Sequence, residues 1–169
     1  MKKILLPLLI LLYYHANAQS NIGSEQYFDF WIGEWNLTWK DGDGTTGTGK
    51  NTISRILNNK VILESFEGLT GQNTGYLGKS WSVYNPRTQE WKQTWVDNQG
   101  AYLDFIGEVQ DENRMFVRKT TGPQGNEIWQ RMVFRDIKKD SFTWDWESSS
   151  DGGSTWSLQW QINYQRKKS

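Results

Sequence analysis

Residues 156–164 of the chain read Trp-Ser-Leu-Gln-Trp-Gln-Ile-Asn-Tyr. Every second residue is apolar, and each residue between is a serine, a glutamine or an asparagine. Successive side chains of a β-strand point to opposite faces of the sheet, so a period of two predicts a strand with one buried and one solvated face. We therefore expect Trp156 and Trp160 to share the buried face of a strand over residues 154–166.

The same alternation recurs along the chain, in residues 142–147 and, with one polar residue in its apolar row, in residues 91–95. Short turn signals such as Asp41-Gly42 and Asn98-Gln99-Gly100 separate the runs and leave no room for crossover helices. An antiparallel meander is therefore predicted, with only residues 24–31 available for a helical turn. About ten strands are expected, near 33–40, 46–57, 60–68, 75–84, 90–97, 101–109, 114–120, 126–137, 141–148 and 154–166.

A meander of this size is compatible with an open sandwich, a membrane barrel or a closed soluble barrel. A sheet of consecutive hairpins has two edge strands with unpaired backbone groups. Closure into a barrel pairs these two strands, which favours a barrel over a sandwich. The polar face of residues 156–164 is unsuited to lipid, which argues against a membrane barrel. We predict an all-β fold, an antiparallel meander of about ten strands closed into a barrel, with room for a small ligand.

The first eighteen residues predict a secretory signal peptide. Residues 1–3 form a basic start, residues 4–14 are apolar, and Ala16-Asn17-Ala18 fits a cleavage site. The apolar run is shorter than the roughly 20 residues that a membrane span needs. We expect export to the periplasm or the medium, no membrane insertion, and one barrel domain over residues 19–169 that is a monomer or weak dimer.

Composition restricts the chemistry of the exported chain. Removal of residues 1–18 takes away His15, the only histidine, and the chain has no cysteine. Catalytic triads, thiol catalysis, zinc sites with their usual ligands and histidine-ligated haem are then excluded. Of the 19 Lys and Arg, Lys2 and Lys3 are also lost, which leaves 17 against 19 Asp and Glu, a net charge of −2. We expect no metal, no cofactor and no nucleic-acid partner.

The start of the first predicted strand carries a known motif. Residues 28–35 read Phe-Asp-Phe-Trp-Ile-Gly-Glu-Trp, and the Gly33-x-Trp35 pair after a short helical turn resembles the opening of lipocalins and other calycins. The resemblance implies that Trp35 closes one end of the barrel against a basic residue near the last strand. Arg166 is an even number of residues from Trp160, so it points to the same face of the strand and fits this role. Its contact with Trp35 would be a cation–π interaction of roughly 1–2 kcal/mol.

The resemblance extends along most of the chain. Residues 28–35, 84–86, 93–97 and 147–156 together are similar to an uncharacterised bacterial family of exported calycin-like proteins. This resemblance implies a calycin- or lipocalin-like barrel, and it brings no established activity with it.

A second motif lies just before the last strand. Residues 149–156 match the S-x-D-x-G-x-T-W pattern of the Asp-box, familiar from sialidase propellers. The motif implies a hairpin in which Asp151 accepts backbone hydrogen bonds, Gly153 has a positive φ and Trp156 packs beneath. A sialidase would carry several copies in a longer chain, so we expect a structural role here.

Carboxylates are the remaining groups for acid–base chemistry. Alternation places Glu147 on the solvated face of its strand. Asp104 is a weak catalytic candidate. Its row, with Tyr102 and Ile106, is as apolar as the row of Leu103 and Phe105 on the other face, so either row can be the buried one. A buried carboxyl group would have a raised pKa and could act as a general acid or base. The candidates on predicted strands are Glu64, Asp104, Glu108 and Glu147.

Filling a wide barrel accounts for most of the eleven tryptophans without a ligand. Polar residues within aromatic rows nevertheless predict a pocket, because a few polar groups on an aromatic wall are typical of small-molecule sites. For residues 126–137, either the row of Gln130 or the row of Arg131 faces inward. The candidate ligand-binding residues are Trp91, Gln93, Trp95, Arg131, Trp144, Trp146 and Trp160.

These patterns favour binding over catalysis. The leading hypothesis is an exported lipocalin-like protein that binds a small, partly apolar or aromatic ligand inside the barrel. Two alternatives are a carbohydrate-binding module with exposed tryptophans and a cofactor-free isomerase or cyclase with an inward carboxylate.

Overall fold

The structure, a computed structural model, describes residues 24–110 and 112–168. The predicted signal peptide and His15 lie outside these residues. Each of the ten predicted segments coincides with a strand to within three residues at either end. In order, the elements are η1 (Ser24–Gln26), η2 (Asp29–Trp31), β1 (Gly33–Lys40), β2 (Thr46–Ile56), β3 (Val61–Gly68), η3 (Gly71–Asn73), β4 (Leu77–Asn85), β5 (Glu90–Asp97), β6 (Tyr102–Gln110), β7 (Asn113–Thr121), β8 (Glu127–Arg135), β9 (Ser141–Ser149) and β10 (Ser157–Arg166).

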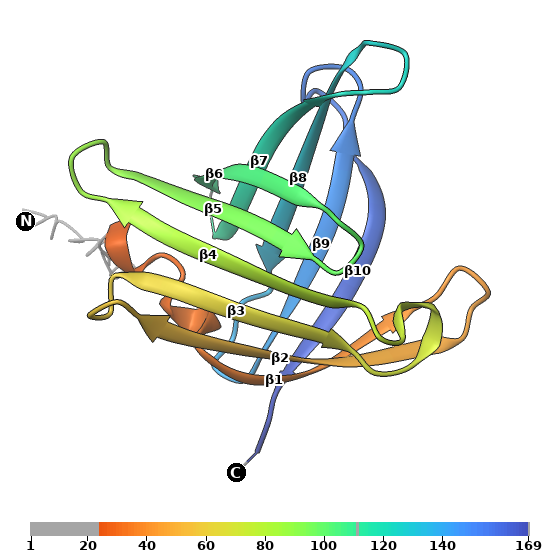
Figure 1. Ribbon diagram of the computed structural model, residues 1–169, viewed down its shortest axis with the longest axis horizontal. Coiled ribbons are helices and arrows are strands. Elements are labelled where there is room, and N and C mark those ends of the chain that lie inside the picture. Colours follow the sequence, from red (N-terminus) through yellow and green to blue (C-terminus); the bar gives the residue numbers. More distant parts are fainter. Residues whose placement is uncertain (1–23, 111, 169) are drawn as a thin grey trace, which may run out of the picture.

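The ten strands form a closed antiparallel barrel, as predicted. Each strand pairs with its neighbours in the sequence, and β10 pairs with β1 to complete the ring, with Trp35 opposite Arg166. Figure 1 shows the turns β1–β2, β3–β4 and β5–β6 at one end of the barrel and the N-terminal segment, in orange, at the other. Every strand is therefore paired with a neighbour on both sides over at least part of its length, so the barrel has no free edge strand.

The N-terminal segment plugs one end of the barrel with aromatic side chains. The predicted helical turn is two short 3₁₀ helices, η1 and η2. Phe28 and Trp31 are fully buried. The Phe28 ring stacks on Phe116 with centroids 4.4 Å apart, and Trp31 meets Phe134 edge-on at 5.2 Å. Because such rings bury large apolar areas, this half of the barrel is packed solid.

An irregularity in β10 corrects one sequence prediction. The pairing of β10 with β9 changes register between Leu158 and Trp160. Such a bulge adds one residue to a strand and reverses the side-chain alternation beyond it. Trp160 therefore faces the interior, whereas Leu158 is 54% exposed. The expectation that Trp156 and Trp160 share a buried row is wrong, because the two lie on opposite sides of the bulge.

The helices of the described residues are short 3₁₀ turns, and none of them is long and apolar enough to cross a membrane.

Candidate functional site

A cavity of about 190 Å³ occupies the half of the barrel opposite the N-terminal plug. It lies where the strands approach the β3–β4 and β5–β6 turns, because its lining includes Phe66 near the end of β3 and Leu103 near the start of β6. An engineered apolar cavity of about 150 Å³ accepts benzene, so the volume fits a one-ring molecule with a short substituent.

Eight aromatic residues line the cavity. They come from strands on opposite sides of the ring, so the aromatic groups surround the space. Trp144 and Trp160 meet edge-on with centroids 5.7 Å apart, and Phe105 meets Trp146 in the same way at 6.0 Å. The aromatic lining residues are Phe66, Tyr76, Trp95, Phe105, Trp144, Trp146, Trp160 and Tyr164.

One carboxyl group, that of Glu64 on β3, is buried among these rings at 5% exposure. Ser80 Oγ donates to its Oε2 at 2.6 Å, and Asn51 Nδ2 donates to its Oε1 at 2.7 Å. Asn51 Nδ2 also donates to the Tyr164 hydroxyl at 3.1 Å. Burial raises the pKa of Glu64 to about 7, and the hydrogen bonds from Ser80 and Asn51 oppose that rise.

A second carboxyl group, that of Asp97 at the end of β5, also lines the cavity. Burial raises its pKa, but hydrogen bonds from Ala101 N–H, Trp95 Nε1, the Tyr76 hydroxyl and Gln99 N–H outweigh burial and hold the pKa below its usual value. Asp97 is therefore a fixed negative charge whose oxygens also anchor two of the aromatic lining residues.

One fully buried polar atom of the lining residues lacks a hydrogen-bond partner. The indole N–H of Trp160 is buried and has no hydrogen-bond acceptor among the described residues. Leaving such a donor unsatisfied costs about 1–3 kcal/mol.

Four of the seven predicted ligand-binding residues, Trp95, Trp144, Trp146 and Trp160, line this one cavity. Trp91 instead belongs to the plugged half, where its Nε1 donates to the Ser24 carbonyl at 2.7 Å. Gln93 is buried in the same inward row and donates to Ser82 Oγ at 2.9 Å without reaching the cavity. Whether the four cavity tryptophans bind a ligand remains a prediction.

Arg131 does not belong to the cavity. Met132, the next residue, lines it, so Gln130 and Met132 form the inward row of β8 and the inward placement of Arg131 is wrong. Its guanidinium lies over the Trp156 ring, 3.9 Å from the centroid, on the outer face. Its Nε donates to Glu147 Oε2 at 2.6 Å.

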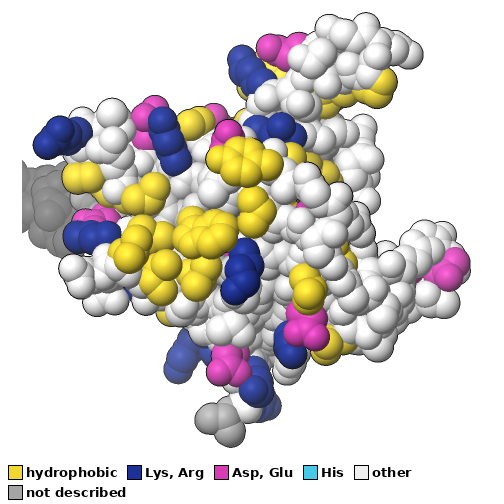
Figure 2. Space-filling view, viewed as in Figure 1, with side chains coloured by type: hydrophobic (Ala, Val, Ile, Leu, Met, Phe, Trp, Pro, Cys, Tyr) yellow, Lys and Arg dark blue, Asp and Glu magenta, His cyan; other side chains and the backbone are white. Residues whose placement is uncertain are grey.

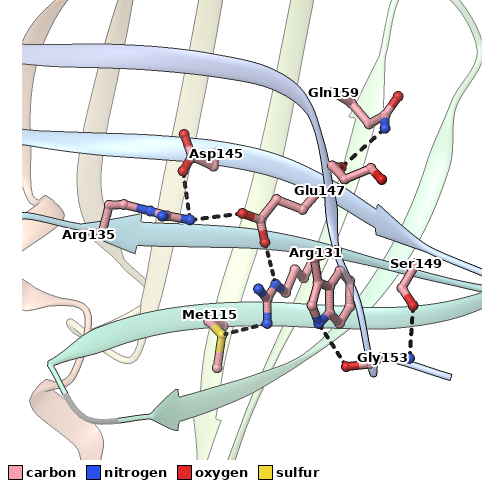
Figure 3. A network of polar contacts seen from close by, with 10 residues as sticks. Met115, Arg131, Arg135, Asp145, Glu147, Ser149, Gly153 and Gln159 are labelled. Atoms are coloured by element: carbon pink, nitrogen blue, oxygen red, sulfur yellow. Dashed lines mark hydrogen bonds and ion pairs between the residues drawn. The ribbon is translucent and has the colours of Figure 1, made fainter. Parts of the chain in front are cut away.

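The outer face of β8 and β9 carries a network of ion pairs, shown in Figure 3. Arg135 Nη2 contacts Asp145 Oδ2 at 2.7 Å and Glu147 Oε1 at 2.9 Å, and Glu147 in turn pairs with Arg131. Asp145 is 1% exposed and Glu147 is 8% exposed. The prediction that Glu147 is solvated is therefore wrong: it faces outward, but the side chains of Arg131 and Arg135 pair with it, and the Trp156 ring lies against Arg131.

Asp104 is on the exposed outer face of β6, between the exposed side chains of Tyr102 and Ile106. The weak catalytic candidate therefore has no access to the cavity, and the carboxyl groups that line it are those of Glu64 and Asp97. The sequence pattern that could have identified Glu64 as inward-facing is the alternation on β3. Its neighbours in the same row, Ile62 and Phe66, are apolar, and both are buried.

The predicted structural residues lie as expected. Arg166 lies over Trp35, 4.1 Å from the ring centroid, and its Nη1 donates to the Ile32 carbonyl at 2.8 Å. Gly33 has φ 137°, and a Cβ there would collide with Arg166 Nη1. Glycine is therefore favoured at this position, because L side chains rarely adopt this φ and a Cβ would displace the guanidinium from Trp35.

The Asp-box hairpin also matches its motif. Asp151 Oδ1 accepts from the Thr155 N–H at 2.9 Å, and hydrogen bonds from Thr155 and Ser149 lower the pKa of Asp151 to about 2. Gly153 has φ 87°, and its carbonyl accepts from Trp156 Nε1 at 3.0 Å. The hairpin thus holds Trp156 against the outer face of the barrel.

All eleven tryptophans lie in the described residues, and Trp81 alone is exposed, at 38%. Figure 2 shows hydrophobic side chains grouped on the outer wall of the barrel. The exposed hydrophobic residues of β4 and β6 include Trp81, Val83 and Ile106. A set of coplanar exposed tryptophans, which the carbohydrate-binding alternative requires, is therefore not present.

No protein-family model and no curated protein sequence matches the chain. Among solved structures, a redesigned β-barrel is similar at 12% identity and a TM-score of 0.42, over 85% of this chain and 96% of that chain. A de novo designed fluorescence-activating β-barrel has 13% identity and a TM-score of 0.44, over 85% and 97%. A third structure, described as bound to DFHBI, has 11% identity and a TM-score of 0.45, over 86% and 100%. The similarity is limited to the general arrangement of strands in a barrel.

Proposed function

We propose that this chain is an exported, calycin-like barrel that binds one small, mainly aromatic molecule in the cavity between β3, β5, β9 and β10. The observation that carries the proposal is a 190 Å³ space lined by eight aromatic residues inside an otherwise packed barrel. Well-packed interiors leave few voids larger than a water molecule, so an aromatic space of this size calls for an occupant.

A cavity-filling substitution tests the proposal. Leu103→Trp places a bulky indole ring in the cavity lining, and Leu158→Trp makes the same change at an exposed outer position. We expect the wild type and Leu158→Trp to bind members of a library of one-ring aromatic compounds in calorimetric titrations, and Leu103→Trp to lose that binding. Equal binding by all three proteins would place the ligand elsewhere, and no binding by the wild type would contradict the proposal.

A second candidate is the cofactor-free isomerase, with Glu64 in the role first assigned to Asp104. The specific observation is a carboxyl group with a pKa near 7 inside a cavity, the value expected of a general base. Turnover of an enolisable one-ring ketone that disappears in Glu64→Gln and persists in Asp104→Asn would favour this candidate over pure binding.

A further inference from the structure

The charged residues that line the cavity itself are both acidic, and a cation, Arg118 on β7, lies over the ring of the lining residue Phe105, 5.9 Å from its centroid, with a hydrogen bond to Gln130. Two of its lining residues, Glu64 and Asp97, carry carboxyl groups, and none of its lining residues is a lysine or an arginine. Glu64 has no ion-pair partner within the described residues, since its two hydrogen bonds come from a serine hydroxyl and an asparagine amide. A buried carboxylate without a cation is costly, because burial removes its hydration and two hydrogen bonds offset only part of that loss.

The aromatic lining also favours a positively charged ligand. The faces of tryptophan and tyrosine rings attract cations, and the attraction grows when water is excluded. Trp144, Trp146 and Trp160 line one side of the cavity, and Trp95 and Tyr76 line it near Asp97. A carboxylate among aromatic rings is a suitable environment for a protonated amine attached to an apolar group.

We propose that the ligand of the cavity is an organic cation, a protonated amine on a single apolar or aromatic ring, whose ammonium group pairs with Glu64 while the surrounding rings hold its apolar part. This inference rests on the proposed function and names its ligand class. The two carboxyl groups, of Glu64 and Asp97, disfavour a carboxylic acid as the ligand. A neutral ring would leave Glu64 without an ion-pair partner. The fixed charge of Asp97 draws the cation toward the cavity.

Protonation of Glu64 makes the binding pH-dependent. The titratable groups that line the cavity are Glu64 on β3, Tyr76 before β4, Asp97 on β5 and Tyr164 on β10. Burial raises the pKa of both tyrosines, and Asp97 keeps a lowered pKa, so only Glu64 changes charge between pH 6 and pH 8. With a pKa of about 7, its ionised fraction rises about tenfold over that interval, and the affinity for an amine should rise by about the same factor.

Three compounds with the same ring separate the possibilities in calorimetric titrations. They are 2-phenylethylamine, 2-phenylethanol and phenylacetate. At pH 8 we expect the wild type to bind the amine at least about tenfold more tightly than the alcohol, which is the effect of one charge-assisted hydrogen bond with a cation–π contact. Phenylacetate should bind most weakly.

Matched variants assign the preference to one carboxylate. Glu64→Gln keeps the shape and the hydrogen-bonding capacity of the side chain, so it should bind the alcohol as the wild type does and lose the preference for the amine. Glu67→Gln, on the same strand but in an outward ion pair with Lys50, should change neither. If Glu64→Gln does not fold, Ser80→Ala gives the same information, because loss of that donor raises the pH at which amine binding becomes strong.

The outcomes distinguish the two proposals. Equal or tighter binding of the alcohol by the wild type at pH 8 overturns the assignment of a cation and leaves the binding barrel in place. Amine binding that does not change between pH 6 and pH 8 overturns the role of Glu64. Failure of all three compounds and of the aromatic library overturns the proposed function itself.

Discussion

Replacement of Glu64 by glutamine is expected to change how the stability of the barrel depends on pH. Below about pH 4.5 the carboxyl group is protonated in both the folded and the unfolded chain, so it contributes no pH-dependent difference. Between pH 4.5 and about 7 the unfolded chain ionises while the folded protein keeps its proton, so the free energy of unfolding falls as pH rises. Above pH 7 both states are ionised and the loss is complete.

The magnitude follows from the pKa values. A rise from 4.5 to about 7 corresponds to about 3 kcal/mol between the low-pH and high-pH limits. Glu64→Gln lacks this dependence. The free energy of unfolding of the variant minus that of the wild type should therefore increase by about 3 kcal/mol from pH 4.5 to pH 7.5.

Urea denaturation followed by tryptophan fluorescence at half-unit pH steps measures this difference. Taking the difference between the two proteins cancels the contributions of the other carboxyl groups, provided the sites are independent. Glu108→Gln, at an exposed position on β6, serves as the control and should track the wild type at every pH. A difference between Glu64→Gln and the wild type that stays constant over this range would refute the reasoning.

Three further substitutions have clear expected outcomes. Arg166→Leu removes a cation–π contact and three hydrogen bonds to backbone carbonyls, and should lower the free energy of unfolding in urea by about 2–4 kcal/mol; Arg166→Lys should recover only part of this. Gly78→Ala puts a Cβ into the ring of Trp95, so it should abolish aromatic ligand binding in calorimetry, whereas Gly42→Ala, with open space around it, should not. Glu147→Ala should cost about 3 kcal/mol in the same urea assay, because it leaves Arg131 without an ion-pair partner and Arg135 with Asp145 alone. A loss as large in Glu147→Gln would show that shape rather than charge matters.

The sequence was sufficient to predict the strands and their closure because the period of two is strong in most segments and the turns are short. The alternation also identified four tryptophans that line the cavity, since each of Trp95, Trp144, Trp146 and Trp160 stands in a predominantly apolar row. Parity arguments hold as long as the strand is regular. They failed at Leu158, where a bulge reverses the alternation and no residue pattern announces it.

Burial on the outer face was the second property that alternation did not reveal. A polar row was interpreted as solvated, but Glu147 is covered by Arg131, which itself lies beneath Trp156. The position of this cover depends on the Asp-box hairpin folding across β8, which is a tertiary effect. In the same way, Asp104 and Glu64 both stand in apolar rows, and only the three-dimensional register shows that the row of Glu64 faces the interior and the row of Asp104 faces the solvent.

The contact between the two ends of the chain determines when the barrel can form during folding. Nine of the ten strand pairings join segments that follow one another in the sequence, and the tenth joins β1 to β10. Contacts between distant segments form slowly because a long loop must first be closed. A chain that ends before β10 leaves Trp35 without Arg166 and the cavity without Trp160, Ile162 and Tyr164. The contact of Trp35 with Arg166 and the completion of the cavity wall therefore form in the same folding step, when β10 pairs with β1. A chain without β10 lacks both the contact and the complete wall.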